Sequence, residues 1–393
     1  MTKVNQEHNE TAPELSQPHQ AGDSTTFPGG RVNYLAPMPL PTGEPGQDYV
    51  HAVGEINDTY LTFGVGLPHV FGWQLSLGLI FTGCILIVMF FFPLLIAFLS
   101  IFIGSSFSSV IEGVWLFFEF MVFIGLSSAA FCFVLSISIW YFNHRKYKYA
   151  IAARFNRQRR EACFVPEGET DPVFVPWESL SAWVIETQGV TQYGVQRQYA
   201  MGVGFHHADS GEDYSLEFEC GGLPLAIANW EAIRAYMDYE VHSLKEIQDP
   251  LDLQGPDDPP HEGLHTFYNA RARMRRRYRE GEVDKWYVVG WYAYHFCTLW
   301  TLPFHLTEWE TARVKRIQTR EIPPAMAAWS QPLPAEQWAQ PSAELQRQRE
   351  RLTILRELYP QHSVFSLFTK ARGTDELTVP KRKGKKGKKA KAG

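Results

Sequence analysis

Paired histidines beside acidic residues are the side chains of this sequence best suited to chemistry. His206 and His207 are followed by Asp209 and Glu212, all of which are residue types that bind metal ions. Their spacing matches no standard ligand set, and the segment is typical of a hairpin turn between two strands. We therefore expect no metal site here.

A second histidine pair, His261 and His265, has the four-residue spacing of two ligands on one helix, but Gly263 and the preceding prolines argue against a helix through both. Gly202-x-Gly204 is too short for a nucleotide-binding loop and is followed by no lysine. The sequence holds no nucleophile elbow, zincin motif or P-loop. We predict no catalytic residue, no cofactor-binding residue and no enzyme activity.

The elements that position these residues include two long apolar runs, residues 75–103 and about 114–142. The first is free of charge over more than the roughly 20 residues that cross a bilayer, and Pro93 predicts a kink in it. Small residues at 125–130 allow two helices to approach closely. They could pack the pair on itself, which is the default, or drive oligomerisation.

Basic and aromatic residues flank the second run on its C-terminal side. Trp140 and Tyr141 are typical of a membrane interface, and Arg145, Lys146 and Lys148 follow them. Further basic residues continue to position 160, whereas the loop between the runs has none. This pattern predicts two spans, with both termini in the cytoplasm and basic side chains on anionic lipid.

Two acidic residues, Glu112 and Glu119, lie near the outward end of the predicted hairpin. Carboxylates within a membrane can mark ion or proton paths. At this depth, a solvated acid at the membrane interface is the interpretation we prefer.

Short alternating segments between residues 150 and 220 predict strands, and one at 56–63 is expected to pair with them. We expect residues 173–177 and 180–185 to form a strand pair, and 201–205 and 214–218 a hairpin. A closing helix from Pro224 to about His242 carries Ile227, Trp230 and Ile233 on one apolar face.

An acidic, proline-rich stretch at 248–262 precedes a dense group of arginines. These side chains are expected to contact anionic lipid or the acidic stretch, and nucleic acid is an unlikely partner because the body of the chain is acidic. The group comprises Arg271, Arg273, Arg275, Arg276 and Arg277. The uncharged aromatic stretch at 286–306 is expected to pack as a core helix or lie on the membrane interface; insertion into the bilayer is the third alternative.

Overall composition supports a folded chain with an acidic body and a basic C-terminal tail. The net charge is −5, and removing the eight basic residues of 381–391 leaves −13 for residues 1–380. The five cysteines have no C-x-x-C spacing, so neither a disulfide framework nor a zinc site is expected.

These patterns predict a membrane protein of α+β class. Its expected parts are a disordered N-terminus (1–50), a short β segment before the membrane (51–73), a transmembrane hairpin (74–143), a β-rich cytoplasmic domain with a closing helix (144–245), an acidic then basic linker (246–284), an aromatic and helical region (285–365) and a basic disordered tail (366–393).

The order of hairpin, basic segment, short strands and Trp-bearing helix resembles small bacterial membrane proteins with a pleckstrin-homology-like domain. The segment from Val175 to Leu180, with Pro-Trp-Glu before an apolar residue, carries the resemblance over residues 150–245. More than 140 further residues depart from it. The layout is also similar to an uncharacterised bacterial family often encoded beside type VI secretion and polymorphic-toxin genes, which implies a non-enzymatic accessory or immunity role.

From these observations we expect a bacterial inner-membrane protein that faces the cytoplasm and binds a protein partner. The alternative is a pore-forming or membrane-depolarising effector whose hairpin oligomerises. The sequence leaves the partner and the oligomeric state open.

Overall fold

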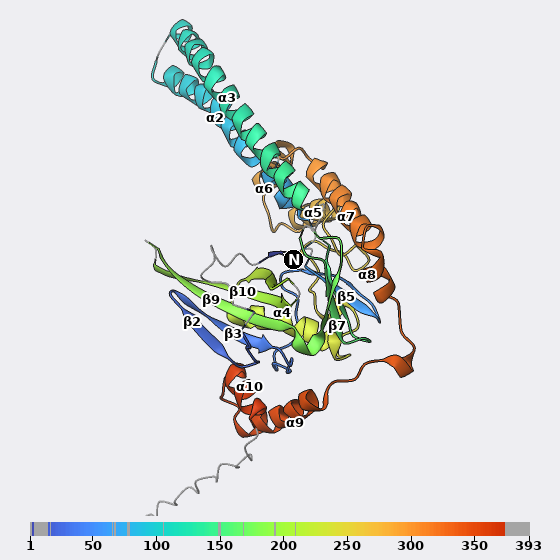
Figure 1. The fold of residues 1–393 in the computed structure, drawn as a ribbon. Helices are drawn as coiled ribbons and strands as arrows, with labels where there is room; N and C mark the ends of the chain where they lie inside the picture. Colours follow the sequence, from blue (N-terminus) through green and yellow to red (C-terminus); the bar gives the residue numbers. More distant parts are fainter. Residues whose placement is uncertain are drawn as a thin grey trace, which may run out of the picture. The chain divides into compact units, whose positions relative to one another are not determined.

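The computed structural model describes residues 2–3, 15, 17–64, 66, 68–76, 79–104, 106–147, 151–167, 169–191, 194–208 and 210–373 (Figure 1). The chain divides into two compact units, each assembled from separate segments. The β unit comprises residues 1–64, 152–248 and 323–393, and the helical unit comprises residues 65–151 and 249–322.

One antiparallel sheet of the β unit has six strands, in the order β1-β11-β10-β9-β3-β2. They are β1 (Thr2–Lys3), β2 (Ser24–Phe27), β3 (Gly30–Ala36), β9 (Ser181–Thr191), β10 (Gly194–His207) and β11 (Glu212–Cys220). The expected hairpin at 201–218 is confirmed, because Met201 lies opposite Phe218 and Phe205 opposite Tyr214.

The second antiparallel sheet has five strands in the order of the chain: β4 (Val53–Ile56), β5 (Tyr60–Phe63), β6 (Ala153–Asn156), β7 (Glu161–Phe164) and β8 (Val173–Pro176). β5 pairs with β6 although residues 64–152 separate them, which confirms the pairing expected for 56–63. The expected pair 173–177 with 180–185 is wrong. β8 and β9 belong to different sheets, and the 3₁₀ turn η1 (Trp177–Ser179) carries the chain from one sheet to the other.

Helix α4 (Leu223–Met237) contacts β9, β10 and β11 of one sheet and β6 of the other. Its Trp230 stacks on Trp177 at 5.2 Å between ring centroids, and both are fully buried. The helix is buried around its whole circumference from Ala226 to Met237. The single apolar face predicted from the sequence is therefore only part of its buried surface. Its polar side chains Asn229, Glu231 and Arg234 are buried with hydrogen-bond partners.

The N-terminal segment is folded over residues 24–48, so the predicted disorder of 1–50 is wrong there. β3 lies beside β9, and Leu35 and Leu40 are fully buried in the core. The Pro- and Gly-rich residues after β3 cover α4: the Gln47 amide donates to the Ala228 carbonyl at 3.0 Å. The composition of these residues predicted disorder, and they form little regular secondary structure. Their backbone groups instead form hydrogen bonds with distant segments of the chain.

The remaining elements of the β unit are short helices. They are η2 (Leu244–Glu246), α8 (Pro324–Trp329), η3 (Ala335–Gln337), α9 (Ala343–Leu358) and α10 (Val364–Arg372). Prolines separate α8, η3 and α9, as expected from the sequence. The amphipathic α9 buries Leu345, Leu352 and Leu355 in the same core as α4.

The helical unit contains α1 (Val70–Ser76), α2 (Leu79–Phe102), α3 (Phe107–Tyr147), α5 (Leu264–Arg279), α6 (Lys285–Cys297) and α7 (Leu302–Arg320). Phe267 of α5 is its central core residue, with Trp291, Trp300 and Phe304 all within 5.7 Å of its ring centroid. α2 and α3 pack along each other as a helical hairpin (Figure 1).

The predicted membrane protein class is wrong. Within the ranges that the structure describes, no helix combines the length and the apolar character that crossing a bilayer requires. The run at 75–103 is divided between α1 and α2, and α3 has 41 residues, or roughly 60 Å, and carries Glu112 and Glu119. Two spans, cytoplasmic termini and an inner-membrane location are therefore all corrected, and the fold is α+β with two antiparallel sheets.

Several of the basic residues that were interpreted as a membrane flank are internal to the β unit. Arg154, Arg157 and Arg160 on and after β6 are almost wholly buried. The number of basic residues along a sequence does not show which of them are buried in the folded protein. Counting buried arginines as membrane-flanking charges led to the wrong orientation prediction.

Two further boundaries change. The predicted linker 246–284 contains the sixteen-residue helix α5, which holds the arginine group. The aromatic stretch 286–306 is two helices, because the chain breaks at Leu299 and Trp300, both with φ of 58°. α6 has thirteen residues, fewer than the roughly 20 that a span needs.

Candidate protein-docking surface on the α2–α3 hairpin

The turn of the hairpin is set by local sequence. Gly104 comes after α2 with a φ of +89°, a left-handed conformation that glycine adopts without strain, and its amide donates to the Ile101 carbonyl. Ser106 then begins α3: its hydroxyl accepts a hydrogen bond from the Ser109 amide at 3.3 Å. The glycine ends one helix and the serine starts the next, which forces a tight reversal.

Close packing of the hairpin depends on Gly125 of α3. A Cβ built at this position would lie 1.7 Å from Sδ of Met89 on α2, so only glycine permits this approach. Met89 is buried against it. The default expectation for the small residues at 125–130, that they pack the hairpin on itself, is therefore confirmed at Gly125.

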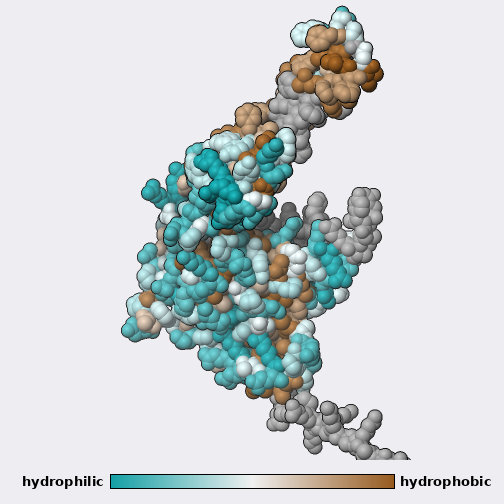
Figure 2. All heavy atoms as spheres, turned by 180° about the vertical axis from the view of Figure 1, so that it is seen from behind, coloured by the Kyte–Doolittle hydropathy of each residue, from teal (hydrophilic) through white to brown (hydrophobic). Residues whose placement is uncertain are grey.

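Much of the rest of the hairpin exposes large apolar side chains. Figure 2 shows brown, hydrophobic atoms gathered on it. Phe102 is 84% exposed and Ile103 is 85% exposed. Exposed large apolar residues in the half nearest the turn are Leu94, Leu95, Ile96, Phe98, Leu99, Ile101, Phe102, Ile103, Phe107, Ile111, Trp115 and Leu116.

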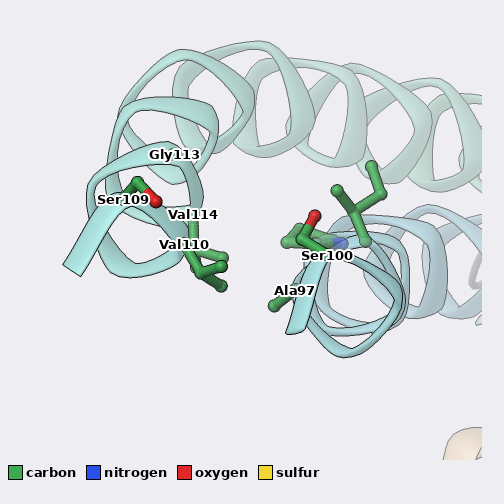
Figure 3. Close-up of a pocket in the computed structure, with 8 residues that line it drawn as sticks. Ala97, Ser100, Ser109, Val110, Gly113 and Val114 are labelled. Atoms are coloured by element: carbon green, nitrogen blue, oxygen red, sulfur yellow. The ribbon is translucent and has the colours of Figure 1, made fainter. Parts of the chain in front are cut away.

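A groove of about 290 Å³ opens between the two helices near the turn. Small residues line it on both sides: Ala97 and Ser100 of α2 face Ser109 and Gly113 of α3 (Figure 3). Pro93, Ile96, Val110 and Val114 complete the lining. The small side chains leave an apolar groove that a larger side chain from another molecule can enter.

The other end of the hairpin is held within the helical unit by α1. Tyr294 of α6 donates a hydrogen bond to Gln74 of α1 at 2.8 Å, and Val70 packs against Phe267 and Phe304. Glu310 of α7 lies beside Trp73, and its burial raises the pKa of its carboxyl group. These contacts join α1, which precedes α2, to the other helices of the helical unit.

The residues predicted to lie at a membrane interface fall on the last part of α3. Tyr141 is exposed, with its ring edge-on to Phe142 at 5.9 Å. Trp140, Arg145 and Lys146 are in the same helix, but their side chains lie outside the described set, as does Lys148 entirely. The predicted lipid-interface role of these five residues stays a prediction.

The arginine group lies on α5, and the structure gives its members different partners. Arg273 pairs with Asp252 of the acidic stretch at 3.1 Å, which is the acidic-linker contact predicted for it. Arg277 pairs with Glu282, and Arg275 donates to the Tyr292 hydroxyl at 3.2 Å. The guanidinium of Arg271 lies 5.6 Å from the ring centroid of Tyr268, and Arg276 is exposed.

The histidines considered for metal binding have other partners. His206 lies 2.7 Å from Asp213, and His207 lies 2.9 Å from Ser210; Asp209 is outside the described residues. The rings of His261 and His265 lie edge to face at 5.9 Å. No group of three metal-binding side chains occurs in the part of the chain that the structure describes. Gly202, on β10, faces the indole of Trp183: its Cβ would lie 2.4 Å from that ring.

The groove at the turn was not predicted from the sequence. Its signal was present as small residues three apart on one helix, Ala97 and Ser100, and four apart on the next, Ser109 and Gly113. These spacings place each pair on one helix face. The antiparallel packing that brings both faces together became apparent only in the structure.

Comparison of the chain with family models, with curated proteins and with solved structures finds no match.

Proposed function

We propose that the protein is a protein-interaction module that docks a partner on the α2–α3 hairpin. The observation that carries this proposal is the extent of exposed apolar surface on the hairpin. Monomeric proteins rarely expose contiguous apolar patches above roughly 300–600 Å² unless the patch is functional. The twelve apolar side chains near the turn lie on several sides of the two helices, and Phe102, Ile103 and Phe107 expose 84%, 85% and 70% of their area.

Docking on this surface is driven by removing apolar area from water, at about 25 cal/mol per Å² before the costs of association. Glu112 and Glu119 are exposed on α3, and α2 carries no charged residue. The surface therefore favours an apolar partner face over a strongly charged one. An immunity or accessory role in a secretion or toxin system stays a prediction, which the identity of the partner would decide.

A pull-down with the tagged full-length chain and mass spectrometry tests the proposal. The triple variant Phe98→Ser, Trp115→Ser and Phe123→Ser removes exposed aromatic rings from the hairpin. Tyr278→Ser removes an exposed aromatic ring from α5 and is the matched control. We expect the wild type and the control to retain the same stoichiometric partner and the triple variant to lose it. Equal retention by the triple variant would overturn the proposal.

A further inference from the structure

The surface of the hairpin carries both a recess and the side chains that fit one. The groove is lined by small residues, including Ser100 and Gly113. Ile103 lies three residues after Ser100, and Phe107 lies three residues before Val110, so each is one helical turn from the groove lining. Ile103 is 85% exposed and Phe107 is 70% exposed.

A surface that holds a groove and a matching protrusion side by side can bind its own copy. In a two-fold symmetric dimer, each patch meets the same patch on its partner, so a groove and a protrusion on each chain form two equivalent contacts. We propose that the hairpin forms a homodimer in which Ile103 and Phe107 of each chain enter the groove between Ala97, Ser100, Ser109 and Gly113 of the other. This inference rests on the proposed function and names its partner.

A stable interface buries roughly 800 Å² on each partner, so the dimer needs the exposed side chains beside the groove in addition to its lining. Ile103 and Phe107, 85% and 70% exposed, supply part of this area. α2 has no charged side chain to bury, and the exposed Glu112 of α3, next to Gly113, has to stay at the solvated rim of the interface. Ser109 already donates its hydroxyl to the Ser106 carbonyl at 2.8 Å, so covering the groove leaves that donor paired.

The structure supplies a substitution that fills the groove without disturbing the hairpin. A Cβ at Gly113 meets no atom within 4 Å, and Gly113 lies in a helix, where leucine has a higher helix propensity than glycine. Gly113→Leu therefore blocks entry of a partner side chain while α3 stays folded. Gly290 of α6 is equally open, so Gly290→Leu is the matched control.

Sedimentation velocity of the full-length chain, from about 1 to about 50 μM, measures the association. We expect a dimer for the wild type and for Gly290→Leu. Gly113→Leu, and separately the double variant Ile103→Ser with Phe107→Ser, should each weaken association by at least about tenfold. A dimer that neither variant weakens would overturn the groove contact.

A mixture of the two variants tests the proposed contact more directly. Gly113→Leu keeps its protrusions, and the double variant keeps its groove, so one of the two equivalent contacts can form between them. Energy transfer between differently labelled variants should exceed that within either variant alone, and equal transfer would contradict the proposal. A wild type that is monomeric, but retains another protein through the hairpin, overturns the homodimer and leaves the proposed function standing. A monomer that retains nothing overturns both.

Discussion

The interior of the β unit and the surface of the α2–α3 hairpin place polar and apolar side chains in opposite ways. The β unit encloses Arg157, 2% exposed, beneath the rings of Tyr236 and Tyr239. The hairpin leaves Phe102 and Ile103 almost wholly in the open. Buried arginines keep their positions because each has specific partners, whereas an apolar surface has no such specificity until another surface covers it.

The partners of the buried charges are distributed over several elements. Arg157 donates to the carbonyls of Asp58 and Val241, both at 3.1 Å. On α4, Glu231 accepts hydrogen bonds from Thr42 and from Arg234. Burial raises the pKa of Glu231, and these hydrogen bonds oppose the shift. The polar network thus holds the segment around Thr42 against α4. The exposed apolar side chains described on the hairpin form no comparable hydrogen-bond network.

Removal of a buried arginine should lower the free energy of unfolding more than any other substitution considered below. Arg157→Ala leaves buried carbonyls without donors and creates a cavity under two tyrosine rings. We expect a loss of about 3–5 kcal/mol in the free energy of unfolding, measured by urea titration. Arg159→Ala, in the same turn but only partly buried, should cost about 1 kcal/mol. Equal losses would show that the buried network contributes nothing special.

Crowding the inside of the hairpin should have the next largest effect. Gly125→Leu forces a side chain into the space of Met89 and should cost about 1–3 kcal/mol, because overpacking displaces both helices. Amide hydrogen exchange should become faster in α2 and α3, whereas exchange in the β unit should stay as in the wild type. Gly290→Leu, at an equally open position of α6, is the control and should leave exchange unchanged. Slow exchange in Gly125→Leu would contradict the observed packing.

Acidification should change the stability contributed by a buried histidine of the helical unit more than that contributed by an exposed one. His295 stacks on Trp291 at 3.8 Å, and burial lowers the pKa of its ring. The unfolded chain therefore binds the proton more tightly than the folded chain. The stability that depends on neutral His295 is present above its unfolded pKa of about 6.5 and is lost as the pH falls below that value.

Urea titrations at two pH values, one on each side of 6.5, check this expectation. His295→Phe preserves a stacked ring and should reduce the loss of unfolding free energy on acidification. His305→Phe replaces an exposed histidine of the same unit and should leave the loss unchanged. Identical pH dependence in the wild type and His295→Phe would rule out this residue as the source.

The smallest effect is expected at the surface of α5. Arg273 and Asp252 are 50% and 87% exposed in their side chains, so water and salt screen their attraction. Arg273→Ala should change the unfolding free energy by about 0.2–1 kcal/mol at low salt and by less at high salt. A loss comparable to that of Arg157→Ala would mean that exposure does not set the scale of these interactions.

Local patterns predicted several elements well. Alternation placed β5, β10 and β11, and the spacing of Ile227, Trp230 and Ile233 placed α4. Local patterns gave wrong predictions where the burial of a side chain depends on segments far away in the sequence. The closely spaced arginines at 154–160 were interpreted as a flank of a membrane span, yet Arg154 donates to Ser330, far along the chain, inside the β unit.

The sequence alone determined features that depend on nearest neighbours: strands β5, β10 and β11, the closing helix, and the breaks at prolines. Periodicity and capping act over a few residues, so they are visible in one dimension. Only the tertiary structure decided which charges are buried, that residues 24–48 cover α4, and that Ala97 and Ser100 share a groove with Ser109 and Gly113. Burial depends on which segments meet in space, and separation along the chain carries little of that information.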